Sequence, residues 1–376
     1  MKLCLFIGHH KVGSSALQTY LGRNAVALLR HDVLYPAVEG QGLATLLAMA
    51  LNSPGGNGPD WPAELAQPIN LREAHNALAF AMMAEHRGTA VNPLHQGLPP
   101  VKSMLKIVER QIEVLDPQVT ILAAEVFSNF GGLSPKLIRK LYRTFPDADL
   151  TLTATFRRVD DYLASWHGQR LRFGDRMFAL PGALSRYTKT IHFNYRTLLS
   201  PWIKARPEAA LRIRNYDDVV AAGGSVQDFL TGFDLPAPED PAAMPRVNES
   251  LHRAFFEIMR QANKALEKAD AQEMFGALMA LAGEADLPPN RDVELFGAKA
   301  REAMARDFAP IHDWLGKTTG QDAFFPDAEK IGTLCPVPEI EAARAALSAL
   351  QGPLSAELPR AARTFISGLD LEPNYS

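Results

Sequence analysis

The chain opens with a short apolar segment that runs directly into a polar loop bracketed by glycines. Residues 1–7 are mostly apolar, and Gly8 follows them. From residue 14 to residue 29, leucine and valine side chains recur at a spacing that places them on one face of a helix. The opening therefore predicts a buried strand, a tight loop and a helix. This succession is typical of α/β proteins.

The loop between the predicted strand and helix has the composition of an anion site. It reads Gly8-His-His-Lys-Val-Gly13-Ser14-Ser15. At the start of a helix, backbone N–H groups and the positive end of the helix dipole attract anions. The spacing matches the P-loop pattern G-x-x-x-x-G-K-[ST], except that Ser14 replaces the lysine and the lysine lies earlier, at position 11. The alternative is an ordinary strand-to-helix turn whose polar side chains cap the helix.

Three further apolar segments predict more strands of the same sheet. They cover residues 119–124, 150–156 and 210–213. We read the first two as continuous rather than alternating, which is typical of parallel strands that are buried on both faces, and the segment at 210–213 as a fourth candidate strand. We expect an α/β fold: a three-layer parallel sheet with a P-loop-like phosphate-binding loop.

Two long regions lie outside these strands. Residues 38–118 form an expected helical insertion with a loop signal at 53–62, and an insertion of this length is usually a lid or a small cap. From residue 249 onward, alanine and leucine recur with helical periodicity and predict an all-helical C-terminal region. We expect an α/β core in residues 1–240 and a helical region in residues 241–376 that packs on it.

A second anion site is predicted where the strand at 150–156 ends. Arg157 and Arg158 follow it, Asp160 and Asp161 can cap the next helix, and that helix carries Ser165. A guanidinium at the carboxyl end of a strand and a hydroxyl two turns into the next helix can converge on a phosphate. Taken singly, these side chains fit a solvated strand end and a helix-surface serine. Together with the loop they predict a nucleotide with two phosphate groups.

Composition narrows the classes of partner. The chain has 39 lysines and arginines and 42 acidic residues, which gives a net charge of −3. It therefore has no overall positive field that would attract nucleic acid or anionic lipid. Cys4 and Cys335 lie far apart and no zinc-type Cys/His cluster is present, which fits a reducing cytoplasm. The first apolar run is too short for a secretory signal or a membrane span, so no transmembrane segment is expected. The oligomeric state stays open.

The two predicted anion sites together resemble those of the sulfotransferases that use 3′-phosphoadenosine 5′-phosphosulfate (PAPS). Residues 10–18, HKVGSSALQ, are similar to the family's 5′-phosphosulfate loop, and residues 156–165, FRRVDDYLAS, to its 3′-phosphate motif. Residues 209–217, 226–230 and 247–250 follow in the order typical of bacterial members. The resemblance covers about residues 1–30 and 116–260. Many members carry Thr-Gly-Thr-Thr where this chain has Val12-Gly-Ser-Ser, but serine keeps the hydroxyl.

The resemblance implies transfer of a sulfuryl group from PAPS to an acceptor hydroxyl or amine, with release of adenosine 3′,5′-bisphosphate. Lys11 would neutralise the leaving 5′-phosphate oxygen, and no metal would be required. The acceptor would be a small molecule or a glycan; the bacterial character of the motifs suggests carbohydrate, and lipids and small alcohols stay open. The implied nucleotide-binding residues are Lys11, Val12, Gly13, Ser14, Ser15, Ala16, Arg157 and Ser165.

A base must take the proton of the acceptor, and the family uses a histidine or a glutamate for this. Glu125 directly follows the strand at 119–124, at the expected carboxyl edge of the sheet. We expect burial to raise the pKa of Glu125, which would make it a better base. Its alternatives are a helix cap or a partner of an arginine. His9 and His10 are rival bases, and His10 is also suited to positioning the loop.

The main alternative function is a P-loop kinase or NTPase that uses ATP and magnesium, with Glu125 or Asp160 acting on the metal. The missing lysine after Gly13 argues against it, as do the arginines at the strand end where such enzymes place an aspartate. A second alternative is a nucleotide- or polysaccharide-binding module without chemistry. The presence of Lys11 and of a candidate base argues against that module.

Overall fold

The chain divides into two compact units. The computed structural model describes residues 1–52, 67–237 and 250–371. The first unit holds the described residues of 1–157, 195–247 and 318–320, and the second those of 158–194, 248–317 and 321–376. Residues 158–194 therefore group with the C-terminal region, whereas the sequence predicts a boundary after residue 240. The loop predicted at 53–62 and most of the segment 247–250 lie outside the described residues.

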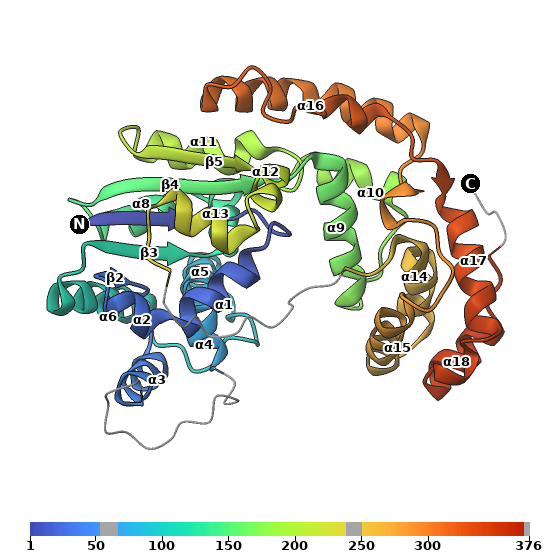
Figure 1. The fold of residues 1–376 in the computed structure, drawn as a ribbon, viewed down its shortest axis with the longest axis horizontal. Coiled ribbons are helices and arrows are strands. Elements are labelled where there is room, and N and C mark those ends of the chain that lie inside the picture. The colour runs from blue at the N-terminus through green and yellow to red at the C-terminus, as the bar shows by residue number, and fades with distance from the viewer. Residues whose placement is uncertain (53–66, 238–249, 372–376) are drawn as a thin grey trace. The chain divides into compact units, whose positions relative to one another are not determined.

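A parallel sheet is the centre of the first unit. In the described residues it has five strands in the spatial order β2-β3-β1-β4-β5, and every neighbouring pair is parallel (Figure 1). The four predicted strands are confirmed as β1 (Lys2–Phe6), β3 (Val119–Ala123), β4 (Asp149–Phe156) and β5 (Ala210–Asn215). The edge strand β2 (Val33–Leu34) was not predicted, because two residues are too few to show a pattern.

The central strand β1 is buried as its continuous apolar sequence requires. In β1, the four residues after Lys2 are all buried, so side chains on both faces of this strand are covered. One of these faces carries Cys4 and Phe6, which join a core cluster with Leu17, Leu21 and Phe229. This cluster fixes the first helix of the chain directly over the strand that precedes it.

The helices of the first unit follow the expected pattern with one interruption. The predicted helix at 14–29 is split into α1 (Ser14–Arg23) and α2 (Ala25–Leu29), because Asn24 ends α1 with hydrogen bonds from its backbone N–H and its Nδ2 to the Tyr20 carbonyl. The other helices of this unit are α3 (Gly40–Leu51), α4 (Ile69–Arg72), α5 (Ala74–Arg87), α6 (Val101–Leu115), η1 (Glu125–Phe127), α7 (Ser128–Leu133), α8 (Pro135–Arg143), α11 (Tyr195–Ala205), α12 (Tyr216–Ala221) and α13 (Ser225–Gly232).

The strand order places a switch point at the centre of the sheet. From β1 the chain proceeds to β2 on one side, and from β4 it proceeds to β5 on the other side. The loops that leave the carboxyl ends of β1 and β4 therefore diverge. In open parallel sheets this divergence creates the crevice where ligands bind. The residues after β1 and β4 are those for which the sequence predicts the two anion sites.

The second unit is mostly helical, but it also contains a short sheet. Strands β6 (Val293–Glu294) and β7 (Val337–Pro338) pair in parallel, which corrects the expectation of an all-helical C-terminal region. Its helices are α9 (Val159–Arg172), α10 (Leu180–Tyr187), η2 (Arg253–Phe255), α14 (Phe256–Ala265), α15 (Lys268–Leu281), η3 (Asn290–Asp292), η4 (Ala328–Gly332), α17 (Glu339–Gln351), η5 (Ser355–Glu357), α18 (Arg360–Ser367) and most of α16 (Ala298–Thr319). Among all the described helices, none is both long and apolar enough to cross a bilayer.

Candidate functional site

The loop after β1 has an unusual backbone. Gly8, Lys11 and Gly13 all have positive φ angles, of 88°, 60° and 83°. A side chain rarely adopts this region, and a lysine there stores about 1 kcal/mol of strain or more. At Gly8 a Cβ would lie 2.7 Å from the Cα of Glu125, so no larger residue fits. The loop is thus held in one specific shape, in contact with the segment that carries Glu125.

Hydrogen bonds tie this loop to the end of β4. The Ile7 N–H donates to the Thr153 carbonyl at 2.9 Å, and the His9 N–H donates to the Thr155 carbonyl at 3.2 Å. The Thr155 N–H in turn donates to the Gly8 carbonyl at 3.1 Å. Arg157 comes two residues after Thr155. The loop and the start of the second predicted anion site therefore lie at the carboxyl ends of two adjacent, paired strands.

The N-terminus of α1 presents its backbone donors without a side-chain cap. Gly13 is the N-cap residue with left-handed backbone angles, and within the described residues no side chain accepts from the first N–H groups of α1. The first turn also lacks an acidic residue. The N–H groups of Ser14, Ser15 and Ala16 have no acceptor within the helix, since the first turn of any helix leaves its donors unpaired. Such a terminus attracts an anion.

Glu125 lies beside this helix start and contacts two loop residues. Ser14 Oγ donates to Glu125 Oε2, and His10 Nδ1 lies 3.3 Å from Glu125 Oε1. Burial raises the pKa of Glu125, but the interactions with His10, with the Ser14 hydroxyl and with Lys11 outweigh burial and hold this pKa below its usual value. The expectation of a raised pKa is therefore wrong. The carboxylate is ionised at neutral pH and pairs with the loop rather than with an arginine.

The adjacent residues Arg157 and Arg158 have different surroundings. The Arg157 guanidinium lies over the ring of Tyr216, 5.2 Å from its centroid, and no ion pair with a carboxylate is recorded for it among the described residues. Its backbone carbonyl accepts from the Tyr195 hydroxyl at 2.8 Å. Arg158 belongs to the second unit and is enclosed by the carboxylates of Asp160, Asp161 and Asp327. Of the two, Arg157 is the one suited to an external phosphate.

The expected roles of Asp160 and Asp161 need correction. Helix α9 begins at Val159 with Arg158 as its N-cap, and no side chain caps it within the described residues. Asp160 and Asp161 lie inside the first turn, where their carboxylates pair with buried arginines: Asp160 with Arg158, and Asp161 with Arg158 and Arg253. These aspartates therefore stabilise the second unit.

Ser165 lies on α9, in the second unit. Its Oγ is buried and has no hydrogen-bond partner in the described chain. A buried hydroxyl without a partner is costly, which makes it a candidate for contact with a bound group. Lys11, His10, Glu125 and Arg157 belong to the first unit, where the structure gathers them around one end of the sheet.

Tyr216, which lies in the segment 209–217 that resembles the family, is the first residue of α12, and its ring supports the Arg157 guanidinium. Sequence reasoning did not single out one residue that the structure places at the loop. Ser225 is the first residue of α13, and its Oγ donates to the Gly13 carbonyl at 2.8 Å. The paired glycines 223 and 224, both with positive φ, were the available signal for a special turn before Ser225.

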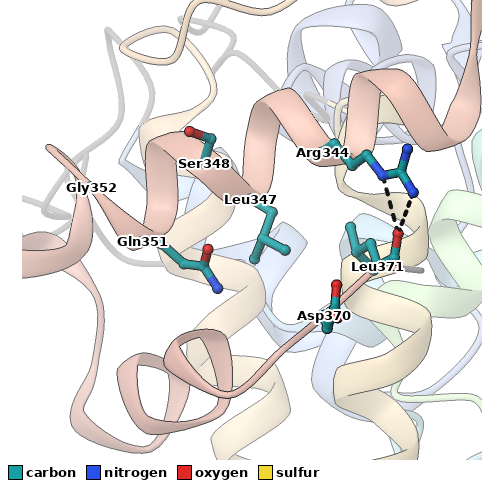
Figure 2. Close-up of a pocket in the computed structure, with 7 residues that line it drawn as sticks. All are labelled: Arg344, Leu347, Ser348, Gln351, Gly352, Asp370 and Leu371. Carbon is teal, nitrogen blue, oxygen red and sulfur yellow. Dashed lines mark hydrogen bonds between the residues drawn. The ribbon is translucent and has the colours of Figure 1, made fainter.

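A cavity elsewhere in the chain involves none of these residues. It has a volume of about 500 Å³ and lies in the second unit (Figure 2). Two of its polar side chains are already hydrogen-bonded to backbone carbonyls. Arg344 donates twice to the Leu371 carbonyl, and Gln351 donates to the carbonyls of Ile366 and Leu369. We assign no function to this cavity. Within the described residues, no group of histidine, cysteine and acidic side chains is arranged to hold a metal ion.

Comparisons with known proteins do not test the resemblance to the sulfotransferases, which stays a prediction. No family model matches the chain, and neither a curated protein nor a solved structure matches it. The function must therefore be argued from the site itself.

Proposed function

We propose that this protein is a sulfotransferase that moves a sulfuryl group from PAPS to an acceptor hydroxyl or amine. The observation that carries the proposal is the pairing of the Gly8–Gly13 loop with the end of β4. It places an uncapped helix terminus and Arg157 at the carboxyl ends of adjacent strands. Two anion-binding groups on neighbouring strands suit a nucleotide with a phosphate at each end of its ribose. The proposed architecture is a three-layer α/β sheet with a P-loop-like loop, which the burial of both faces of β1 supports.

In the proposed reaction the acceptor oxygen or nitrogen attacks the sulfur of PAPS. A new bond to sulfur forms while the bond between sulfur and the bridging 5′-phosphate oxygen breaks in line. The electron pair of that bond stays on the 5′-phosphate, where charge builds up. Lys11 and the N–H groups of Gly13, Ser14 and Ser15 would stabilise this charge, and groups already fixed in place contribute most to such catalysis.

The acceptor proton needs a base, for which we propose the pair of His10 and Glu125. Glu125 remains our candidate for contact with the proton, although its lowered pKa makes it a weaker base than expected. His10 Nδ1 lies 3.3 Å from Glu125 Oε1 and would orient this carboxylate toward the acceptor. Glu125→Gln should therefore reduce turnover more than nucleotide affinity, because Gln keeps the contact with Ser14 but cannot take up a proton.

At the other end of the nucleotide, Arg157 would bind the 3′-phosphate. Its guanidinium is supported by Tyr216 and is not neutralised by a carboxylate among the described residues. Ser165, whose buried Oγ has no hydrogen-bond partner among the described residues, keeps its predicted role as a donor to a bound group. The acceptor is a small molecule or a glycan.

Thermal unfolding with added nucleotides tests the proposal. Adenosine 3′,5′-bisphosphate without magnesium should raise the melting temperature, since a ligand that binds the folded state stabilises it. ATP with magnesium should leave the melting temperature unchanged. A shift with ATP and magnesium alone would favour a kinase or NTPase and contradict the proposal. Transfer of labelled sulfate from PAPS to a panel of glycans, phenols and lipids would then identify the acceptor.

A further inference from the structure

Helix α13 approaches the candidate anion loop from a distant part of the sequence. Its first residue, Ser225, donates from Oγ to the Gly13 carbonyl at 2.8 Å. The two side-chain atoms of Ser225 also pack against the Cα of Gly13: a Cβ on Gly13 would lie 2.8 Å from Ser225 Oγ and 3.0 Å from Ser225 Cβ. Ser225 thus fills the space in which any side chain at position 13 would lie.

This contact fixes the orientation of one peptide plane. The Gly13 carbonyl also accepts the Leu17 N–H at 3.2 Å, so it is held by two donors. A trans peptide points its C=O and its N–H in opposite directions. The N–H that shares the plane with the Gly13 carbonyl is that of Ser14. With the carbonyl held toward Ser225 and Leu17, the Ser14 N–H must point away from the helix and into the loop.

Helix α13 is held in place by ion pairs and by a buried aromatic side chain. The Asp228 carboxylate accepts from Arg212 at 2.8 Å and from Arg214 at 3.1 Å. Phe229 is buried, and its ring meets the ring of Phe6 edge-on at 6.5 Å. Phe229 also belongs to the core cluster that contains Leu17 of α1. The hydroxyl of Ser225 is therefore presented from a helix that is attached both to the sheet and to α1.

We propose that Ser225 is a positioning residue for the anion site: it holds the Gly13 peptide so that the Ser14 N–H is directed at the bound phosphate. The inference deepens the proposed function, on which it rests for the identity of the nucleotide. Ser225 acts through the backbone of the loop, without contact to the ligand. The two glycines before it, with φ of 93° and 98°, make the turn that brings Ser225 to this place.

The test compares Ser225→Ala with Ser225→Thr and with Thr45→Val as a matched control. Thr45 Oγ1 donates to the Gln41 carbonyl at 2.9 Å, so Thr45→Val also removes one hydroxyl bond to a backbone carbonyl in the same unit, outside the candidate site. Affinity for adenosine 3′,5′-bisphosphate should fall about fivefold in Ser225→Ala, the value of one hydrogen bond, and should be restored in Ser225→Thr. Thr45→Val should leave this affinity unchanged.

A second readout follows the amide resonance of Ser14 while inorganic phosphate is added. In the wild type this resonance should move on titration, and in Ser225→Ala it should move less at every phosphate concentration. If Ser225→Ala does not fold, Ser225→Cys, which keeps the size but is a poor donor, replaces it with the same expectation.

The outcomes separate the two proposals. Equal affinity and an equal Ser14 response in wild type and Ser225→Ala overturn the positioning role and leave the proposed function intact. A response to inorganic phosphate that depends on Ser225, without any binding of adenosine 3′,5′-bisphosphate, supports the positioning role and contradicts the proposed nucleotide. If the Ser14 resonance responds to neither compound in the wild type, both proposals are wrong.

Discussion

At the scale of single residues, neighbours in the sequence have separate purposes. The guanidinium of Arg157 lies over the ring of Tyr216. The guanidinium of the next residue, Arg158, forms ion pairs with carboxylates that include Asp160 and Asp327. The sequence predicts that both arginines follow the end of a strand, because an apolar segment comes directly before them. Which arginine is neutralised could not be predicted, because Asp327 lies 169 residues further along the chain.

This difference predicts opposite effects of the two alanine substitutions. Arg157→Ala should weaken binding of adenosine 3′,5′-bisphosphate about tenfold or more, since a charge-assisted bond is worth about 1.5–3 kcal/mol, and should change stability little. Arg158→Ala should lower the free energy of unfolding by about 1.5–3 kcal/mol, because it removes charge-assisted bonds to buried carboxylates. Of these carboxylates, Asp161 keeps Arg253 and Asp160 keeps Arg301. Urea unfolding and calorimetric titration measure both. Equal loss of stability in the two variants would contradict the assignment.

Glu125 shows the limit of sequence reasoning about a pKa. Its place after a buried strand predicts burial, which raises the pKa. The partners that lower the pKa, His10 and Ser14, come from a loop more than a hundred residues earlier in the sequence. Their contact depends on the pairing of β1 with β3. The sequence therefore predicts a raised pKa, and the lowering could not be foreseen before the sheet order was known.

At the scale of helices and strands, long apolar runs were predictable and short elements were not. Strands β1, β3 and β4 follow from longer apolar segments, and β5 follows from the short segment at 210–213. The two-residue strands β2, β6 and β7 carry no such pattern. The helix at 14–29 was predicted as one because its apolar spacing continues past Asn24, whereas the bonds of Asn24 to the Tyr20 carbonyl end α1 there.

The attachment of α13 to α1 gives a prediction at this scale. Phe229→Ala should lower the free energy of unfolding by about 3–5 kcal/mol, since it opens a cavity among buried rings and leucines. Val220→Ala on α12 is the control: this side chain is 54% exposed, so its truncation should have little effect. Urea unfolding curves measure both variants. A small change in Phe229→Ala would show that α13 is not part of the folded core.

At the scale of the whole molecule, each unit buries a histidine in its neutral form. Burial lowers the pKa of His75, in the first unit, to about 3 and that of His167, in the second, to about 4. In the unfolded chain both would titrate near 6.5. Between these values the unfolded state binds more protons than the folded state, so stability is full above pH 6.5 and is lost as pH falls below it.

Each of these histidines should therefore remove about 2 kcal/mol of stability between about pH 7 and about pH 5. His75 Nδ1 accepts the Ala123 N–H at 3.1 Å, and protonation would destroy this bond. His75→Asn places a non-titrating acceptor there, so the loss of stability on acidification should be smaller by about the same amount. Urea unfolding at the two pH values measures it. An unchanged pH dependence in His75→Asn would contradict burial of a neutral His75.

The central claim is that one nucleotide spans the loop and Arg157, and calorimetric titration with three ligands tests it most directly. The ligands are adenosine 3′,5′-bisphosphate and the two adenosine monophosphates that carry only the 5′- or only the 3′-phosphate. Lys11→Ala should bind the bisphosphate no better than the 3′-phosphate, and Arg157→Ala no better than the 5′-phosphate, while the wild type prefers the bisphosphate to both. If both substitutions abolish the preference for the same phosphate, or neither changes any preference, the two residues do not hold opposite ends of one nucleotide.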